Sequence, residues 1–261
     1  MLASLYVSKT GLSAQDRQLT TISNNLANTS TIGFKRDRAI FEDLLYQNQR
    51  QAGTQQTPDT ELPSGLQLGA GVRVVATEKE FTQGNLQVTE QTFDVAIDGH
   101  GFLQMLMPDG SIAYTRNGQL QLNSDGQVCN SDGYLLEPAI IVPEGTTKVT
   151  IGADGAVNAF SPGEVEPQPL GDITLVDFIN YPGLQPIGGN LFLETVASGN
   201  PIEGTPGENG LGIIKQGMLE NSNVDIVEEM VNMITTQRAY EMNSKVVSTA
   251  DQMLQYITQN L

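Results

Sequence analysis

The side chains best suited to chemistry are few and stand alone. The chain has one histidine, His100, between Gly99 and Gly101, and one cysteine, Cys129. A histidine can act as a general base, but no nucleophile or orienting carboxylate can be assigned to His100, so we interpret it as a turn residue. One cysteine cannot form an internal disulfide, and one histidine cannot supply the paired imidazoles of most zinc sites. We interpret Cys129 as a packed side chain and predict no catalytic, metal or cofactor site.

The carboxylates are numerous but show no metal-binding or catalytic spacing. Asp94 and Asp98 form a pair of the kind that chance produces among 30 acidic residues. Several Asp-Gly and Asn-Gly pairs lack the spacing of a calcium loop, which needs further acidic ligands and a downstream glutamate. They are typical of type I′ hairpin turns, because both residues tolerate positive φ. These pairs are Asp109-Gly110, Asn117-Gly118, Asp125-Gly126, Asp132-Gly133 and Asp154-Gly155.

The charge of the chain excludes another class of function. Among 261 residues, 13 are Lys or Arg and 30 are Asp or Glu, so the net charge is −17. A surface this acidic repels nucleic acid and anionic lipid. The charge is uneven, with +1 over residues 1–45, −14 over 46–219 and −4 over 220–261. The middle of the chain therefore differs in character from its two ends.

The first segment has the periodicity of an amphipathic helix. Leu5, Leu12, Leu19 and Leu26 recur every seven residues, and Ile22 falls on the same face. The pattern predicts a helix over about residues 2–28, roughly 40 Å long. Gly11 inside it is a weak point that costs about 1 kcal/mol relative to alanine.

The last segment repeats this pattern. An apolar stripe begins at Val224 and continues at spacings of three and four, which predicts a helix from 224 to about 259. Ser222 and Asn223 are the candidate N-caps, and acidic residues follow in the first turn. The stripe continues through Val227, Val231, Ile234, Ala239, Met242, Val246, Ala250, Met253, Ile257 and Leu261.

Between the ends the helical period disappears and short alternating runs separated by turns take its place. This pattern predicts a mostly antiparallel β domain over about residues 72–221. Residues 46–65 differ from both patterns, because they contain five glutamines and two prolines with no apolar periodicity. We interpret them as a linker or an exposed recognition loop. Expected strands include 72–77, 94–97, 102–107, 172–178 and 191–194.

The elements together predict an α+β fold in which long N- and C-terminal helices form a coiled-coil-like pair around a central β domain. We expect a helical assembly domain over 1–35 and 222–261, an extended connector over 36–71 and a β-rich outer domain over 72–221. Terminal helices can pair with each other and with their copies in neighbouring subunits, which is typical of an assembly protein. A head-to-tail interface would give a helical filament, and a two-fold interface would give a closed dimer. No stretch approaches the roughly 18 apolar residues of a membrane span, and no signal peptide is evident, so export would need another route.

Two runs of residues resemble the end signatures of the bacterial flagellar rod and hook proteins. The first is ISNNLAN at residues 22–28, with Thr31 and then GFKR at 33–36. The second is EEMVNMI at 228–234, QRAYE at 237–241, Ser244-Lys245 and DQML at 251–254. The segment from FEDLLY at 41–46 to LPSG at 62–65 resembles the part that distinguishes rod from hook proteins. The resemblance covers nearly the whole chain and is strongest over 1–98 and 217–261.

The resemblance implies a non-enzymatic subunit that polymerises into the distal rod of the flagellar basal body, a rigid tube that transmits torque and encloses the export channel. It also implies type III export into the periplasm without a cleaved signal peptide. The implied partners are further copies of the chain, proximal rod proteins, the hook protein, the P-ring and L-ring proteins and the export apparatus.

The residues that would carry these roles form two groups. The expected assembly interface contains Leu5, Leu12, Leu19, Ile22, Asn24, Asn25, Leu26, Asn28, Val227, Met230, Val231, Ile234, Tyr240, Met242, Val246, Met253, Leu254 and Ile257. The expected rod-specific segment contains Tyr46, Gln47, Arg50, Gln55, Pro58, Leu62 and Pro63.

Two alternatives remain open. One is a proximal rod or hook subunit of the same family. The other is a soluble acidic β-rich binding module or enzyme whose terminal helices pack on its own core. The lack of a catalytic constellation and of any tryptophan disfavours the second alternative.

Overall fold

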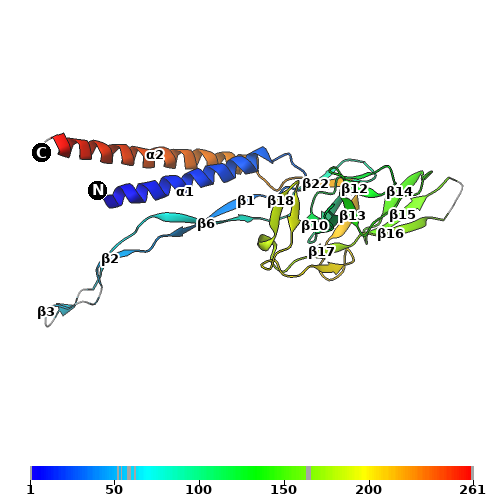
Figure 1. Ribbon diagram of the computed structural model, residues 1–261, viewed down its shortest axis with the longest axis horizontal. Coiled ribbons are helices and arrows are strands. Elements are labelled where there is room, and N and C mark those ends of the chain that lie inside the picture. Colours follow the sequence, from blue (N-terminus) through cyan, green and yellow to red (C-terminus); the bar gives the residue numbers. More distant parts are fainter. Residues whose placement is uncertain are drawn as a thin grey trace. The chain divides into compact units, whose positions relative to one another are not determined.

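The protein divides into two compact units, each built from segments far apart in the sequence. The computed structural model describes residues 2–51, 53, 55–57, 60–61, 63–162 and 166–259. The helical unit comprises Met1–Ala27, Asp37–Glu78 and Asp225–Leu261, and the β unit comprises Asn28–Arg36 and Lys79–Val224. The predicted α+β class, with terminal helices and a mostly antiparallel β domain, is confirmed (Figure 1).

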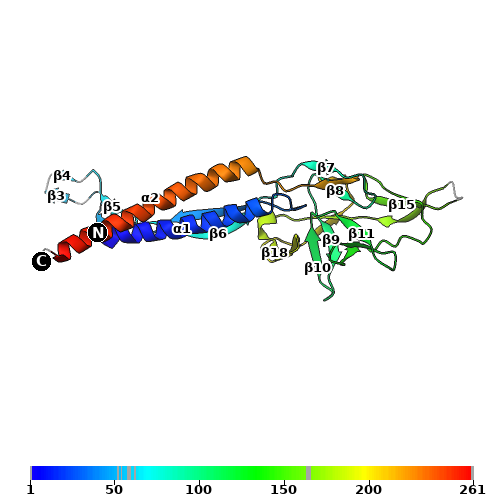
Figure 2. The ribbon, with the colours of Figure 1, turned by 90° about the horizontal axis from the view of Figure 1, so that it is seen from above.

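The helical unit is built around two long helices, α1 (Leu2–Ala27) and α2 (Ile226–Gln259). They run antiparallel beside each other, so that the two termini lie at the same end of the unit (Figures 1 and 2). No helix among the described residues is long and apolar enough to cross a membrane. Both helices that the periodicity predicted are therefore present.

The cap of α2 differs from the prediction. The Asp225 carboxylate accepts hydrogen bonds from the backbone N–H groups of Val227 (2.8 Å) and Glu228 (3.2 Å), so it caps the helix in place of Ser222 or Asn223. The Asn223 side chain is engaged elsewhere in the β unit. It accepts from the N–H of Arg36 at 2.7 Å and donates to the carbonyl of Glu80 at 2.8 Å.

The rest of the helical unit is a two-stranded ribbon made from successive antiparallel pairs. The described residues of 46–65 form neither a helix nor a core strand, but most of their backbone is paired. All four residues of β2 are exposed, which explains why they carry no apolar alternation. The pairs are β1 (Asp37–Asp43) with β6 (Val72–Lys79), β2 (Gln47–Arg50) with β5 (Leu66–Leu68), and β3 (Gln55–Thr57) with β4 (Thr60–Glu61).

The largest sheet of the β unit has seven antiparallel strands. Strand β11 lies at one edge of this sheet and β18 at the other. In spatial order its members are β11 (Leu120–Leu122), β12 (Val128–Asn130), β13 (Leu135–Glu137), β9 (Leu103–Leu106), β10 (Ile112–Thr115), β19 (Leu191–Leu193) and β18 (Gln185–Gly188).

Smaller antiparallel groups complete the β unit. A three-stranded sheet is formed by β14 (Lys148–Ile151), β15 (Ala156–Phe160) and β16 (Gln168–Asp172). The strand pairs are β7 (Leu86–Val88) with β22 (Met218–Glu220), β8 (Val95–Asp98) with β21 (Ile213–Gln216), and β17 (Leu175–Asp177) with β20 (Ile202–Gly204), and one 3-10 helix spans Tyr181–Gly183.

Four of the five predicted turns close hairpins, but the type I′ prediction is wrong. In each of these loops the glycine N–H donates to the carbonyl three residues earlier, as from Gly110 to Met107 at 2.9 Å and from Gly155 to Gly152 at 3.1 Å. Only the glycine has positive φ, between 75° and 88°, which defines a type I turn followed by a left-handed glycine. This loop keeps the preceding aspartate out of the left-handed region, which a type I′ turn would force it to adopt. The fifth pair, Asn117-Gly118, joins two strands that do not pair.

The β unit has two hydrophobic cores. The larger lies among strands of several sheets and includes Leu103, Met105, Leu136 and Leu175, each fully buried. The second collects many of the chain's few aromatic rings around Phe102, with edge-to-face partners that include Phe81, Phe178 and Phe192. Gathering the large rings in one place allows a chain without tryptophan to form a dry core.

Candidate assembly surface

The run at residues 22–28, which resembles the flagellar family, contains two asparagines that connect three elements of the helical unit. Asn25, near the end of α1, is 1% exposed. Its amide donates to the carbonyl of Asp37 (2.8 Å) and to a carboxylate oxygen of Glu229 on α2 (3.3 Å), and its oxygen accepts from the N–H of Asp37 (2.8 Å). Asn24 adds a bond to the Asp37 carboxylate at 3.1 Å. The two asparagines thus tie α1 to β1 and α2.

Gly11 permits α1 and α2 to approach closely. A Cβ at this position would lie 3.2 Å from the Asn243 amide nitrogen of α2, and that nitrogen donates to Gln15 at 3.1 Å. Glycine stabilises a helix less than alanine does, and the close packing of the two helices at Gly11 offsets this loss of stability.

The GFKR run of the same signature lies in the β unit. Gly33 has φ of +70°, and a Cβ there would approach the backbone nitrogen of Asn117 to 2.7 Å, so only glycine fits. Phe34 is buried, with the Lys79 ammonium 4.9 Å from its ring centroid. The run therefore anchors the segment that follows α1 in the β unit.

Lys35 of this run belongs to a buried ionic triad with Glu220 and Arg116. Lys35 Nζ lies 2.7 Å from Glu220 Oε1, and Arg116 Nη1 lies 3.1 Å from Glu220 Oε2. The Lys35 and Glu220 side chains are fully buried and that of Arg116 nearly so. Burial lowers the pKa of the Lys35 ammonium, against the opposing effect of the Glu220 carboxylate. Glu220 is thus the only acidic member of a cluster with two cations, a role that no local pattern indicates.

On α1, the predicted stripe is largely covered within the chain. Ile22 is 2% exposed, and Leu5, Leu12, Leu19 and Leu26 are half-buried. Asn28, which begins the β unit, is also half-buried and accepts from the Thr31 hydroxyl at 3.1 Å.

On α2, most of the predicted residues are exposed. The side that faces α1 carries half-buried Met233, Ala239 and Asn243 and buried Ala250. Leu254 is half-buried, while Ile257 lies in the helix with its side chain outside the described residues. The other predicted side chains are between 41% and 71% exposed and form what we call the outer stripe, Val227, Met230, Val231, Ile234, Tyr240, Met242, Val246 and Met253.

Several described residues of the predicted segment 46–65 form a second exposed surface on the ribbon. Tyr46 is 54% exposed next to Leu45, which is 92% exposed. Gln47 and Arg50 lie on exposed β2, Gln55 lies in β3, and Pro63 is exposed. Pro58 and Leu62 lie outside the described residues.

His100 lies between β8 and β9 in the β unit, where it forms a β-bridge with Leu211 in place of the predicted turn. The flanking glycines both have positive φ, 120° at Gly99 and 125° at Gly101. His100 Nδ1 lies 3.1 Å from the Tyr181 hydroxyl, which donates to Asp177 at 2.5 Å. Burial and the bond to Asp177 raise the pKa of Tyr181. The geometry accounts for His100 as part of a surface hydrogen-bond chain.

Two paired terminal helices with an apolar stripe left exposed define a class of protein, the subunits of larger assemblies. Comparison with known proteins specifies which assembly. Three family models match, namely a flagella basal body rod protein model over residues 5–35, the flagellar hook protein FlgE/F/G D1 domain over 96–159, and the flagellar basal body rod FlgEFG protein C-terminal model over 215–260.

Individual relatives match along the whole chain. The flagellar basal-body rod protein FlgG of Buchnera aphidicola subsp. Schizaphis graminum is 55% identical over 259 residues, 99% of this chain and 100% of the relative. FlgG of Caulobacter vibrioides is 46% identical, over 99% of both chains. FlgG of Bacillus subtilis is 35% identical, over 98% of this chain and 97% of the relative. The chain therefore belongs to the flagellar rod and hook family, and it is a structural component of the flagellar basal-body rod.

Proposed function

We propose that the chain polymerises into the distal rod, a rigid tubular shaft that transmits torque from motor to hook and encloses the export channel, and that its role is structural rather than enzymatic. The observation that carries this proposal is the outer stripe of α2. Val227 is 71% exposed and Met242 is 69% exposed. Their apolar surface lies in water and does not contribute the free energy that burial would provide. Neighbouring subunits that cover the stripe would recover it.

The inferred contacts follow from the two exposed surfaces of the helical unit. Terminal helices of adjacent copies would pack through the outer stripe, and the ribbon segment 46–65, which is exposed over 46–51, would contact a further copy and stiffen the tube. Proximal rod proteins and the hook protein would meet the two ends of the polymer, the P-ring and L-ring proteins would surround it, and the flagellar type III export apparatus would deliver the subunits. The full-length match to FlgG proteins supports these assignments.

The substitution Ile234→Asp tests the interface. Ile234 is 50% exposed in the outer stripe, so the monomer keeps its own packing, but an unpaired carboxylate buried between subunits costs several kcal/mol, about 2–7 even for a neutral polar group. We expect the purified variant to stay monomeric in sedimentation and electron microscopy, and cells that carry it to lose motility. Leu12→Asp should have the same effect on assembly, but Leu12 is half-buried within the monomer, so Ile234→Asp is the cleaner variant.

Ser244→Asp is the matched control, since it adds the same charge at an exposed polar position of α2. The control should assemble, and both variants should melt like the native monomer. Normal assembly of Ile234→Asp would show that the outer stripe is not the subunit interface.

A further inference from the structure

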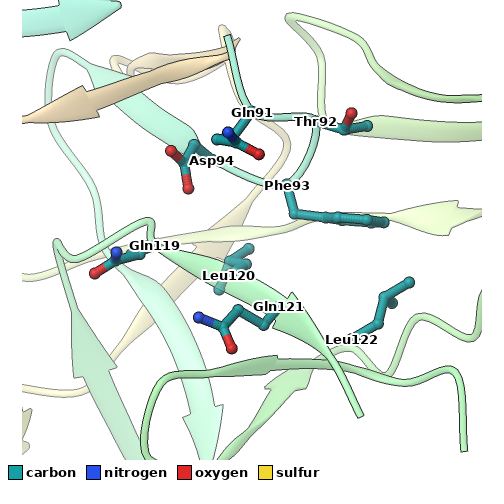
Figure 3. A pocket seen from close by; sticks show the side chains of 8 residues that line it. All are labelled: Gln91, Thr92, Phe93, Asp94, Gln119, Leu120, Gln121 and Leu122. Atoms are coloured by element: carbon teal, nitrogen blue, oxygen red, sulfur yellow. The ribbon is translucent and has the colours of Figure 1, made fainter. Parts of the chain in front are cut away.

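A second surface suited to binding lies in the β unit, beside the edge strand β11. One edge of β11 pairs with β12. On its other edge, Gln119, the residue just before β11, forms a single β-bridge with Asp94. Beyond that bridge the segment 91–94 and β11 diverge and leave a pocket of about 560 Å³. Figure 3 shows the two segments on opposite sides of this pocket, which is lined by Gln91, Thr92, Phe93, Asp94, Gln119, Leu120, Gln121 and Leu122.

Asp94 is the unusual residue of the pocket. It is 7% exposed, yet among the described residues no side chain or backbone group donates a hydrogen bond to its carboxylate. Asp98, four residues later, illustrates the usual arrangement, with Lys215 Nζ at 2.6 Å and the Gln83 amide at 3.0 Å. The carboxylate oxygens of Asp94 reach solvent and have no hydrogen-bond donor among the described residues, so a ligand that brings a cation and hydrogen-bond donors can pair with them.

The other lining groups indicate the shape of that ligand. Phe93, Leu120 and the 40% exposed Leu122 supply apolar walls, along which a chain of methylene groups can lie. The exposed amides of Gln91, Gln119 and Gln121 can bond to peptide groups. An edge strand is also the place where an extended peptide adds to a sheet. An arginine on an extended segment combines all three features, because its planar guanidinium pairs with a carboxylate through two hydrogen bonds.

We propose that this pocket binds an arginine presented on an extended segment of a different, basic protein. The chain itself is a poor source of that arginine. It carries only 13 basic residues against 30 acidic ones. Five of the basic residues, Lys35, Arg38, Arg73, Arg116 and Lys215, form ion pairs within the chain. The net charge of −17 attracts a basic partner and raises its rate of encounter.

The test uses the full-length protein and a model peptide, acetyl-Thr-Val-Arg-Val-Thr-amide, titrated with NMR detection at Asp94, Gln119 and Leu122. Its control peptide replaces the arginine with citrulline, which has the same shape and no charge. We expect the citrulline peptide to bind at least about tenfold more weakly than the arginine peptide. This is the loss of affinity expected when the charged hydrogen bond to the Asp94 carboxylate is missing. The native protein and Asp94→Asn should have the same melting temperature.

The variant completes a thermodynamic cycle. On Asp94→Asn the two peptides should bind equally, because the partner of the charge is gone. Asp172→Asn makes the same charge change at an exposed residue of β16, outside the pocket, and should preserve the preference for arginine.

Three results would overturn the proposal. Equal binding of the two peptides to the native protein would show that the guanidinium charge does not contribute to binding. No binding of either peptide would show that the pocket does not bind such a segment. Tighter binding of a peptide of residues 45–51, which contains Arg50, would make a second copy of this chain the occupant. None of these results bears on polymerisation through α2.

Discussion

The helical unit and the β unit satisfy their apolar groups in different ways. In the β unit, Leu103, Met105 and Leu136 are fully buried, and even the charges of the Lys35, Glu220 and Arg116 triad are paired inside. In the helical unit, α1 covers one side of α2 only, and the outer stripe remains in water. The β unit thus has a complete core of its own, whereas the helical unit has apolar surface left for neighbours.

The difference indicates that the two units of the chain have different roles. A complete core lets the β unit present fixed surfaces, while an uncovered helix gains its full stabilisation only when subunits join. Substitutions in the two units should therefore affect different quantities. In the β unit they should change the stability of the monomer, and on the outer stripe they should change assembly.

The largest effect on monomer stability is expected from Glu220→Gln. The substitution leaves Lys35 and Arg116 as buried cations without a carboxylate, which costs about 3–5 kcal/mol. Denaturant unfolding of the purified monomer measures the loss. The control Glu144→Gln removes an exposed carboxylate of the β unit and should change the stability by less than about 0.5 kcal/mol. Equal effects of the two variants would mean that the triad does not stabilise the β unit.

A smaller effect, confined to alkaline pH, is expected at Tyr114. Burial, with the Glu194 and Glu203 carboxylates nearby, raises the pKa of Tyr114 from 10.0 to about 12. Above pH 10 the unfolded chain releases this proton while the folded chain keeps it, so the stability of the β unit falls as pH rises from 10 to 12.

Tyr114→Phe should flatten that part of the stability profile. Tyr240→Phe, at an exposed position on α2, controls for the loss of a phenol and should leave the slope unchanged. An unchanged slope in Tyr114→Phe would contradict the burial of a neutral phenol at this position.

The smallest effect on the monomer is expected from Met242→Ser in the outer stripe. The side chain is 69% exposed, so unfolding of the monomer should shift by less than about 0.5 kcal/mol. The same change should raise the concentration needed for polymerisation, because the methionine would be buried between subunits. A large loss of monomer stability would place Met242 in the monomer's own core and contradict the comparison of the two units.

The sequence predicted the parts of the fold that depend on local periodicity. The heptad of Leu5, Leu12, Leu19 and Leu26 located α1, and the stripe from Val224 onward located α2 within two residues of its observed start. Periodicity identifies the apolar side of a helix but not what covers that side. Only the structure shows that Ala239 and Ala250 of the predicted stripe face α1, while most of its larger side chains remain exposed.

Other features depend on contacts that no local pattern reveals. Glu220 pairs with Lys35 across 185 positions and with Arg116 across 104, so the triad was not predictable from spacing. Strand β2 of the ribbon was missed because an exposed glutamine-rich strand lacks alternation. The Asp-Gly pairs located the turns but not their type, since the loop length depends on how the flanking strands pair.

Amide hydrogen exchange on the full-length protein, as monomer and as polymer, tests the central claim most directly. We predict that the amides of the β unit are protected to a similar degree in both states, and that those of α1 and α2 gain strong protection only in the polymer. Equally strong protection of the helices in the isolated monomer and in the polymer would contradict the claim that neighbouring subunits complete the helical unit.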